Sequence, residues 1–111
     1  MNIQIDSHGD IKILRVQEDR LAYPVLGSFF SKVSEVIEAG AKKMIIDLTE
    51  VDYIDSASIG CLMDIYRSAN EASGTVKLMG LQERVETMVS MTGLHNLMEI
   101  FREESAALDS F

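Results

Sequence analysis

The chain has 111 residues, of which 47% are hydrophobic and 25% charged, with a single proline. This length and composition predict one globular domain over residues 1–111 and argue against disorder, because the chain can bury one core but not two. The formal net charge of −8, with no cluster of Lys or Arg, excludes nucleic acid and anionic membrane surfaces as expected partners, since both require concentrated positive charge.

Apolar alternation at the start of the chain predicts a β-hairpin. Ile3 and Ile5 alternate with polar residues over the segment 2–6, and a similar alternation resumes over residues 11–17. The residues between them, Ser-His-Gly-Asp, are typical of a tight turn, so the two segments are expected to pair antiparallel.

Helices and strands are expected to alternate through the rest of the chain, after a polar connector over residues 18–23. The expected elements are a helix from residue 25 to a stop at Gly40, a buried strand over 42–48, a short bridge over 50–54, a helix over 56–72, a strand over 75–79, a helix over 82–91, a short strand over 97–101 and a terminal helix over 103–108. This order predicts an α/β sandwich with a mostly parallel sheet faced by helices, because parallel strands are joined by helical crossovers.

The pair Asp55-Ser56 lies where the buried strand and its bridge give way to the long helix. The start of a helix has unpaired backbone N–H groups and a positive dipole end, so a serine there suits a phosphate or another anion. The neighbouring acids Asp52 and Asp55 make the same place sensitive to added charge. From the residues alone, Ser56 as a helix N-cap is the simpler interpretation, and a phosphorylation switch is the alternative.

No enzymatic site is expected. The chain lacks a glycine-rich phosphate loop and a nucleophile–base pair, and Asp52 and Asp55 are interpreted as solvated loop acids because no further ligands accompany them. We therefore expect no metal and no cofactor. Thr49 could accept phosphate but is more simply a polar residue leaving a strand, Ser58 an ordinary first-turn residue, and Cys61 a small buried core residue.

The expected location is the cytoplasm. The opening residues, MNIQIDSHGD, lack the basic and apolar blocks of a signal peptide, and no apolar run reaches the roughly 18–20 residues that a membrane span needs. The acidic surface is compatible with a monomer.

The stretch DLTEVDYIDS, residues 47–56, followed by Ile59-Gly60 and a helix, resembles the signature of the STAS domain, and more narrowly of bacterial anti-sigma-factor antagonists. The likeness extends over essentially the full length of the chain. It implies a STAS-type sandwich and phosphorylation of Ser56 by an anti-sigma serine kinase of the GHKL type. The unphosphorylated chain would bind that kinase and free the sigma factor, phosphorylation would release the kinase, and a serine phosphatase would reset the switch.

The resemblance also implies a docking patch for the kinase. Its expected members are Asp52, Tyr53, Asp55, Ser56, Ser58 and Ile59.

Two positions depart from the family pattern. Ser58 stands where glycine is common, and Ala22 stands where an aspartate often neighbours the phosphorylated serine. These departures support an alternative function, a STAS scaffold or accessory subunit of a transporter or sensor complex that is not phosphorylated. In that case, Ser56→Ala would leave partner binding intact.

Overall fold

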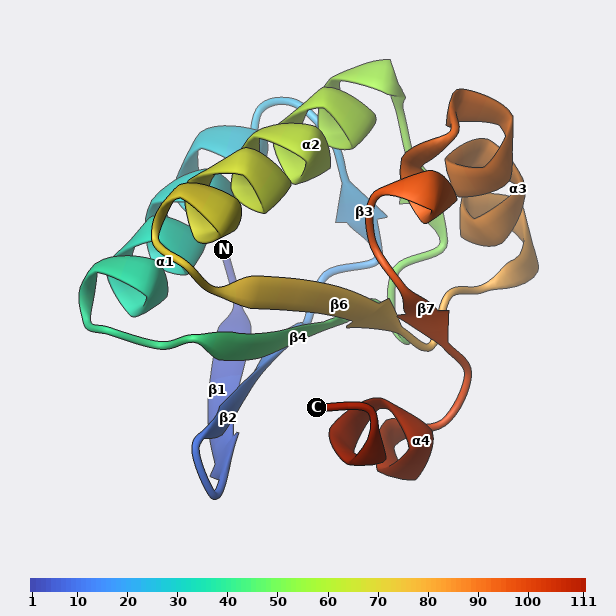
Figure 1. The fold of residues 1–111 in the computed structure, drawn as a ribbon. Coiled ribbons are helices and arrows are strands. Elements are labelled where there is room, and N and C mark those ends of the chain that lie inside the picture. Colours follow the sequence, from blue (N-terminus) through green and yellow to red (C-terminus); the bar gives the residue numbers. More distant parts are fainter.

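A five-stranded sheet in the order β1-β2-β4-β6-β7 forms the middle layer of the protein (Figure 1). In this computed structural model, which describes residues 1–111, β1 and β2 pair antiparallel and the other neighbours pair in parallel. The strands are β1 (Ile3–His8), β2 (Ile11–Val16), β3 (Arg20–Leu21), β4 (Lys43–Asp47), β5 (Tyr53–Ile54), β6 (Thr75–Met79) and β7 (Ile100–Phe101). The predicted α/β fold with an opening hairpin is confirmed.

Helices cover both faces of the sheet, but unequally. They are α1 (Leu26–Glu38), α2 (Ser56–Glu71), α3 (Glu83–Thr92) and α4 (Glu104–Asp109), with a short 3₁₀ helix η1 (Leu94–Asn96) after α3. Figure 1 shows α1 and α2 side by side above the sheet and α4 below it. The sheet therefore has one broad core beneath α1, α2 and α3, and a smaller one against α4.

The alternation of side chains along the strands builds these two cores. In β4, Met44 and Ile46 belong to the larger core and Ile45 to the smaller one, and all three are fully buried. This strand is covered on both faces, which explains its continuous apolar run.

An ion-pair cluster around Arg15 helps to hold α4 against the second face of the sheet. The Arg15 guanidinium lies 2.7 Å from a Glu104 carboxylate oxygen at the start of α4, 3.0 Å from Asp47 and 2.6 Å from Asp6. Hydrogen bonding to Arg15 holds the pKa of Asp6 below its usual value. Lys77, which is buried, donates further hydrogen bonds to Ser110 beyond the end of α4.

Two short strands lie in segments that the sequence pattern assigned to connectors. β3 falls within the expected polar connector 18–23, β5 falls within the expected bridge 50–54, and the two pair in parallel with Leu21 opposite Ile54. Both of these residues are buried in the larger core. Strands of two residues are too short to leave a periodic pattern in the sequence, so the assignment of segment 18–23 as a connector alone was wrong.

The last strand is shorter than expected. Gly93, in the left-handed region with φ +80°, ends α3, and the chain continues into η1, whose Leu94 is fully buried. Only Ile100–Phe101 of the predicted strand 97–101 pairs with β6.

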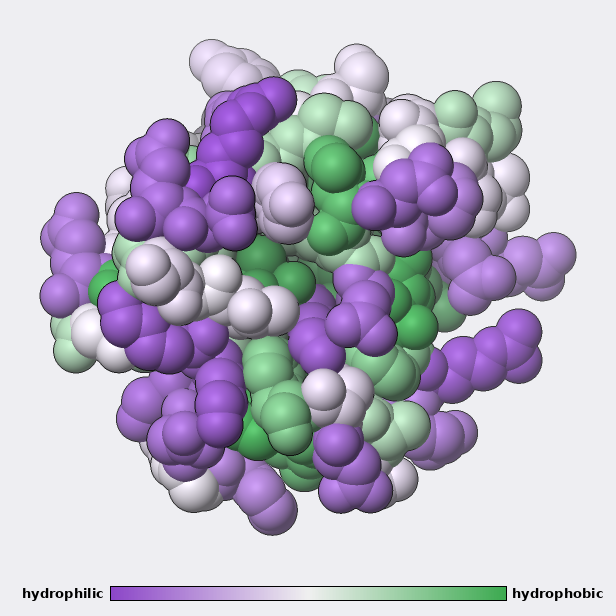
Figure 2. Space-filling model, in the orientation of Figure 1, coloured by the Kyte–Doolittle hydropathy of each residue, from purple (hydrophilic) through white to green (hydrophobic).

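Polar and apolar side chains are distributed unevenly over the surface. Figure 2 shows hydrophilic side chains around most of the outline of the molecule, and hydrophobic atoms mainly in the middle of the face in view. The large apolar residues that are clearly exposed include Tyr23, at 82%, and Met91, at 79%. No helix is both long enough and apolar enough to cross a membrane.

Gly80 and Thr49, at the ends of β6 and β4, lie so close together that we expect position 80 to tolerate no side chain. Gly80 has φ +73°, and a Cβ atom there would overlap the Thr49 hydroxyl. We expect Gly80→Ala to lower the free energy of unfolding by about 1–3 kcal/mol in urea denaturation. The control Gly60→Ala, in open space within α2, should instead stabilise the protein by about 0.5–1 kcal/mol. Equal effects of the two substitutions would contradict this account.

Candidate functional site

The start of α2 lies at the end of a loop that is anchored to the core along its length. Leu48, Val51 and Ile54 are all buried and lead from the end of β4 to Asp55. The backbone N–H of Asp52 donates to the carbonyl of Asp19, at 2.9 Å, which ties this loop to the segment before β3. The segment that delivers Asp55 and Ser56 to the surface is therefore held by packing and by backbone hydrogen bonds.

Asp55, and not Ser56, is the N-cap of α2. The Asp55 carboxylate accepts a hydrogen bond from the backbone N–H of Ser58, at 2.9 Å, and the Ser58 hydroxyl accepts one from the N–H of Asp55, at 3.1 Å. These two bonds form a reciprocal capping box. The interpretation of Ser56 as the N-cap was wrong, because the carboxylate one residue earlier has the spacing of three residues to Ser58 that this arrangement needs.

Ser56 is the first residue of α2 and is exposed to solvent, with no hydrogen bond to its hydroxyl. Its side chain carries no part of the cap. The hydroxyl is therefore free for chemistry at the surface without cost to the start of the helix.

Ser58 does more than the ordinary first-turn role that the sequence suggested. Its side chain is fully buried, and its hydroxyl donates to the carbonyl oxygen of Leu21 in β3. This bond joins the start of α2 to β3 across 37 positions of the sequence. A glycine at position 58 could not form it, so the departure from the family pattern adds a tether at this site.

The capping bonds also set the charge of the site. The hydrogen bond from the backbone N–H of Ser58, with a smaller effect of the N–H of Ala57, holds the pKa of Asp55 below its usual value of 3.8. The carboxylate is thus charged near neutral pH and accepts from the N–H of Ser58, one of the groups that an anion at this helix end would use. The expectation that all of these groups are free for a phosphate is corrected for that N–H.

Only part of the predicted docking patch is accessible. Asp52 and Ser56 are exposed, and Tyr53 and Asp55 are half-buried. Ser58 and Ile59 are buried, with 0% and 4% of their surface exposed, so their side chains add no outer surface. Asp52, Tyr53, Asp55 and Ser56 lie together on the β5–α2 segment, and their binding role stays a prediction.

Sequence reasoning missed Arg20, which lies beside this segment. Its guanidinium carbon is 4.0 Å from the centroid of the Tyr53 ring, because β3 and β5 place the two residues opposite each other. The one signal for β3 was the apolar Leu21 within an otherwise polar connector. Ala22, the other departure from the family pattern, is buried next to Leu21.

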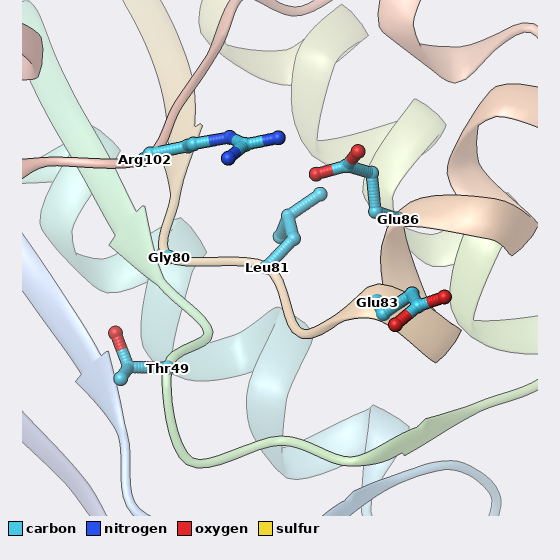
Figure 3. Close-up of a pocket in the computed structure, with 6 residues that line it drawn as sticks. All are labelled: Thr49, Gly80, Leu81, Glu83, Glu86 and Arg102. Atoms are coloured by element: carbon cyan, nitrogen blue, oxygen red, sulfur yellow. The ribbon is translucent and has the colours of Figure 1, made fainter.

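A cavity of about 520 Å³ lies at the carboxyl ends of β4, β6 and β7. It is lined by Thr49, Gly80, Leu81, Glu83, Glu86 and Arg102 (Figure 3). The side chains of Arg102 and Glu86 extend toward each other across the cavity, whereas Thr49 points away from them. The Thr49 hydroxyl donates to a carboxylate oxygen of Asp47, so this alternative phosphate acceptor is already engaged in a hydrogen bond.

Neither the cysteine nor the acidic and histidine side chains form a reactive or metal-binding site. Burial, with a smaller effect of Asp64, raises the pKa of the Cys61 thiol to about 11, so the thiol is protonated near neutral pH. Cys61 is partly rather than fully buried. No group of three or more His, Cys, Asp or Glu side chains converges in a way that could hold a metal ion.

The tether through Ser58 leads to a first prediction for this site. We expect Ser58→Ala to lower the free energy of unfolding by about 1–3 kcal/mol, because the buried carbonyl of Leu21 loses its partner and the capping box is broken. Ser56→Ala should change it by less than about 0.5 kcal/mol, since no bond is lost. Urea denaturation of both variants checks this, and a Ser58→Ala protein as stable as Ser56→Ala would refute the tether.

The lowered pKa of Asp55 predicts a pH dependence. The stabilisation from the charged carboxylate is complete above the unfolded pKa, which is about 3.9, and is lost as the pH falls through the lower folded pKa. Asp55→Asn should therefore be less stable than the wild type at pH 7, and the difference should narrow at pH 3. Urea midpoints at both pH values measure it; a constant difference would contradict the prediction.

Comparison with known proteins agrees with the fold and the signature. Residues 2–107 match the STAS domain family. The anti-sigma-B factor antagonist of Bacillus subtilis is 31% identical over 104 residues, which cover 90% of this chain and 92% of that protein. A Thermotoga neapolitana relative, named as the homologue of a candidate anti-sigma factor antagonist, is 33% identical over 75 residues; the match covers 68% of this chain and 66% of that protein.

Solved structures give the same result. The crystal structure of a candidate anti-sigma factor antagonist from Thermotoga maritima has a TM-score of 0.88 and 25% identity, covering 97% of this chain and 92% of that one. SpoIIAA in its unphosphorylated form has a TM-score of 0.81 at 20% identity, covering 98% and 95% of the two chains, a likeness of fold alone. The resemblance inferred from the signature is confirmed: this chain belongs to the STAS domain family and, within it, to the anti-sigma-factor antagonists.

Proposed function

We propose that the chain is a phosphorylation-controlled antagonist in a partner-switching pathway, with Ser56 as the phosphate acceptor. The observation that carries this proposal is the position of Ser56: an exposed hydroxyl with no hydrogen bond, at the first residue of α2 and directly after its N-cap. A partner kinase can reach such a hydroxyl without unfolding the helix. The unphosphorylated chain binds an anti-sigma serine kinase of the GHKL type, and the phosphorylated chain releases it.

The capping network supports release by charge. A phosphate adds about −1.5 to −2 charges at neutral pH. Because the Asp55 carboxylate already accepts from the backbone N–H of Ser58, a phosphate on Ser56 shares the donors of this helix end with a second anion. It remains at the surface beside Asp52 and Asp55, where it alters the electrostatic match to a partner. Penalties of roughly 1–3 kcal/mol for each disrupted charged contact would weaken binding about 5- to 150-fold.

The chemistry of the switch belongs to the partner enzymes. The chain itself is not an enzyme, so ATP and the metal of phosphoryl transfer belong to the kinase. A serine phosphatase acting on phosphorylated Ser56 resets the cycle. Bacillus SpoIIAA, which shares this fold with a TM-score of 0.73 at 19% identity over 98% of each chain, is known in a phosphorylated form, so the fold tolerates a phosphate.

Phosphorylation in vitro tests the proposal. The purified chain is incubated with ATP and each anti-sigma kinase encoded in the same genome, and phosphate is located by mass spectrometry. We expect phosphate on Ser56 in the wild type and in Ser28→Ala, a control that removes another exposed serine near the start of α1, and none in Ser56→Ala. Ser56→Asp should bind the kinase roughly tenfold or more weakly than the wild type in calorimetry.

The other outcomes are informative. Tight kinase binding with no phosphate on Ser56 would replace the switch with a constitutive antagonist or scaffold. Phosphate on Thr49 or Ser58 would show that the acceptor is wrongly assigned. If no kinase binds or modifies the wild-type chain, the proposed function is wrong.

A further inference from the structure

Arg20 is held in a fixed position but has no carboxylate partner. Its guanidinium lies over the Tyr53 ring, with 4.0 Å from the guanidinium carbon to the ring centroid, and the residue is exposed to solvent. Stacking on an aromatic face restricts the side chain and leaves the N–H groups at the rim of the guanidinium free. No ion pair or hydrogen bond of the protein uses these groups, so Arg20 is a preformed but unoccupied donor.

Three arginines form no ion pair, and of these only Arg20 is stacked on an aromatic ring; the other two are Arg84 and Arg102. The chain has 18 acidic and 10 basic residues, so carboxylates are abundant. Arg15 contacts three of them, and Arg67 pairs with Asp64 at 2.6 Å. Asp19 and Asp52 directly precede Arg20 and Tyr53, yet neither pairs with Arg20, because neighbouring residues of an extended segment point to opposite sides.

The stacked pair lies at the start of α2. Tyr53 precedes Ser56 by three residues, a span of roughly 10 Å in extended chain. The carbonyl oxygen of Leu21, the neighbour of Arg20, accepts a hydrogen bond from the Ser58 hydroxyl. The β3–β5 pair and the first turn of α2 therefore form one connected unit, with Arg20 on the outer side of the unit that presents Ser56.

We propose that Arg20, held against Tyr53, binds a carboxylate on the partner protein that docks at Ser56. This inference rests on the proposed function and specifies the chemistry of the partner surface: an Asp or Glu side chain at the rim of the kinase interface. A planar guanidinium matches a carboxylate with two parallel hydrogen bonds, and the ring restrains it before binding, which lowers the entropic cost of association.

The sign of the switch follows from this contact. A partner carboxylate near Ser56 is attracted by Arg20 and repelled by a phosphate, which carries about two negative charges. At a separation of roughly 10 Å, a little more than the Debye length of about 8 Å at physiological salt, screening weakens this repulsion without removing it. The acids Asp52 and Asp55 alone would give the opposite result with a basic partner, because added negative charge would strengthen that attraction.

Calorimetric titration of Arg20 variants with the kinase tests the inference. The probe is the full-length anti-sigma kinase that binds the wild type, saturated with a non-hydrolysable ATP analogue. Arg20→Ala should bind roughly tenfold or more weakly, Arg20→Glu more weakly still, and Arg20→Lys between the wild type and Arg20→Ala, because lysine keeps the charge but not the planar fork. The control Arg67→Ala, an exposed arginine further along α2, should stay within twofold of the wild type.

A charge reversal on the kinase identifies the contact. One of its surface Asp or Glu residues, changed to Arg, should restore binding of Arg20→Glu while weakening binding of the wild type. Thermal unfolding of each variant confirms that the fold is intact; should Arg20→Glu be unstable, Arg20→Lys and Arg20→Ala carry the comparison.

Two failures are distinguishable. If the kinase binds the wild type and binds Arg20→Ala with the same affinity, this inference is overturned and the proposed function stands. No binding of the wild type by any kinase removes the proposed function, and the role of Arg20 falls with it.

Discussion

Burial of β4 on both faces is the constraint on which the rest of the structure depends. Met44, Ile45 and Ile46 have no exposed surface, and the strand is paired on one side with β2 and on the other with β6. A slip of one residue along this strand would move Lys43 or Asp47 into a position that Met44 or Ile46 occupies in the larger core, so its register is fixed. The loop that leaves its end, with Leu48 and Val51 also buried, therefore brings α2 to one place on the surface.

Ser58 supplies a second attachment at that place. The loop from β4 leads into the start of α2, and the hydrogen bond from Ser58 to Leu21 fastens that helix start to β3 as well. Asp55 completes the arrangement by accepting from the N–H of Ser58. With the helix start held in this way, a modification of the exposed Ser56 would change the charge of the surface more than its shape, which suits a signal that a partner reads by contact.

Ion pairing is unevenly distributed among the charged side chains of the chain. On the second face of the sheet, Arg15 forms ion pairs with Asp6, Asp47 and Glu104, and the hydrogen bond to Glu104 contributes most to raising the pKa of Arg15. At the start of α2, Arg20 remains without an acid despite the overall charge of −8. An acidic protein thus keeps a stacked, unpaired cation close to its candidate phosphorylation site, and the uneven pairing gives that end of the molecule its own electrostatic character.

The sequence by itself determined the order of the main elements, the parallel sheet and the position of Ser56 at the start of a helix, because hydrophobic periodicity and a signature of local residues carry that information. The capping box of Asp55 and Ser58 spans three residues and is local, whereas only the tertiary structure decided that Ser58 is buried and hydrogen-bonded to Leu21. The same holds for Arg20 on Tyr53. The contacts of Ser58 with Leu21 and of Arg20 with Tyr53 join residues more than 30 positions apart through strands of two residues. So short a pairing leaves no period in the sequence, and its existence depends on how the surrounding core closes.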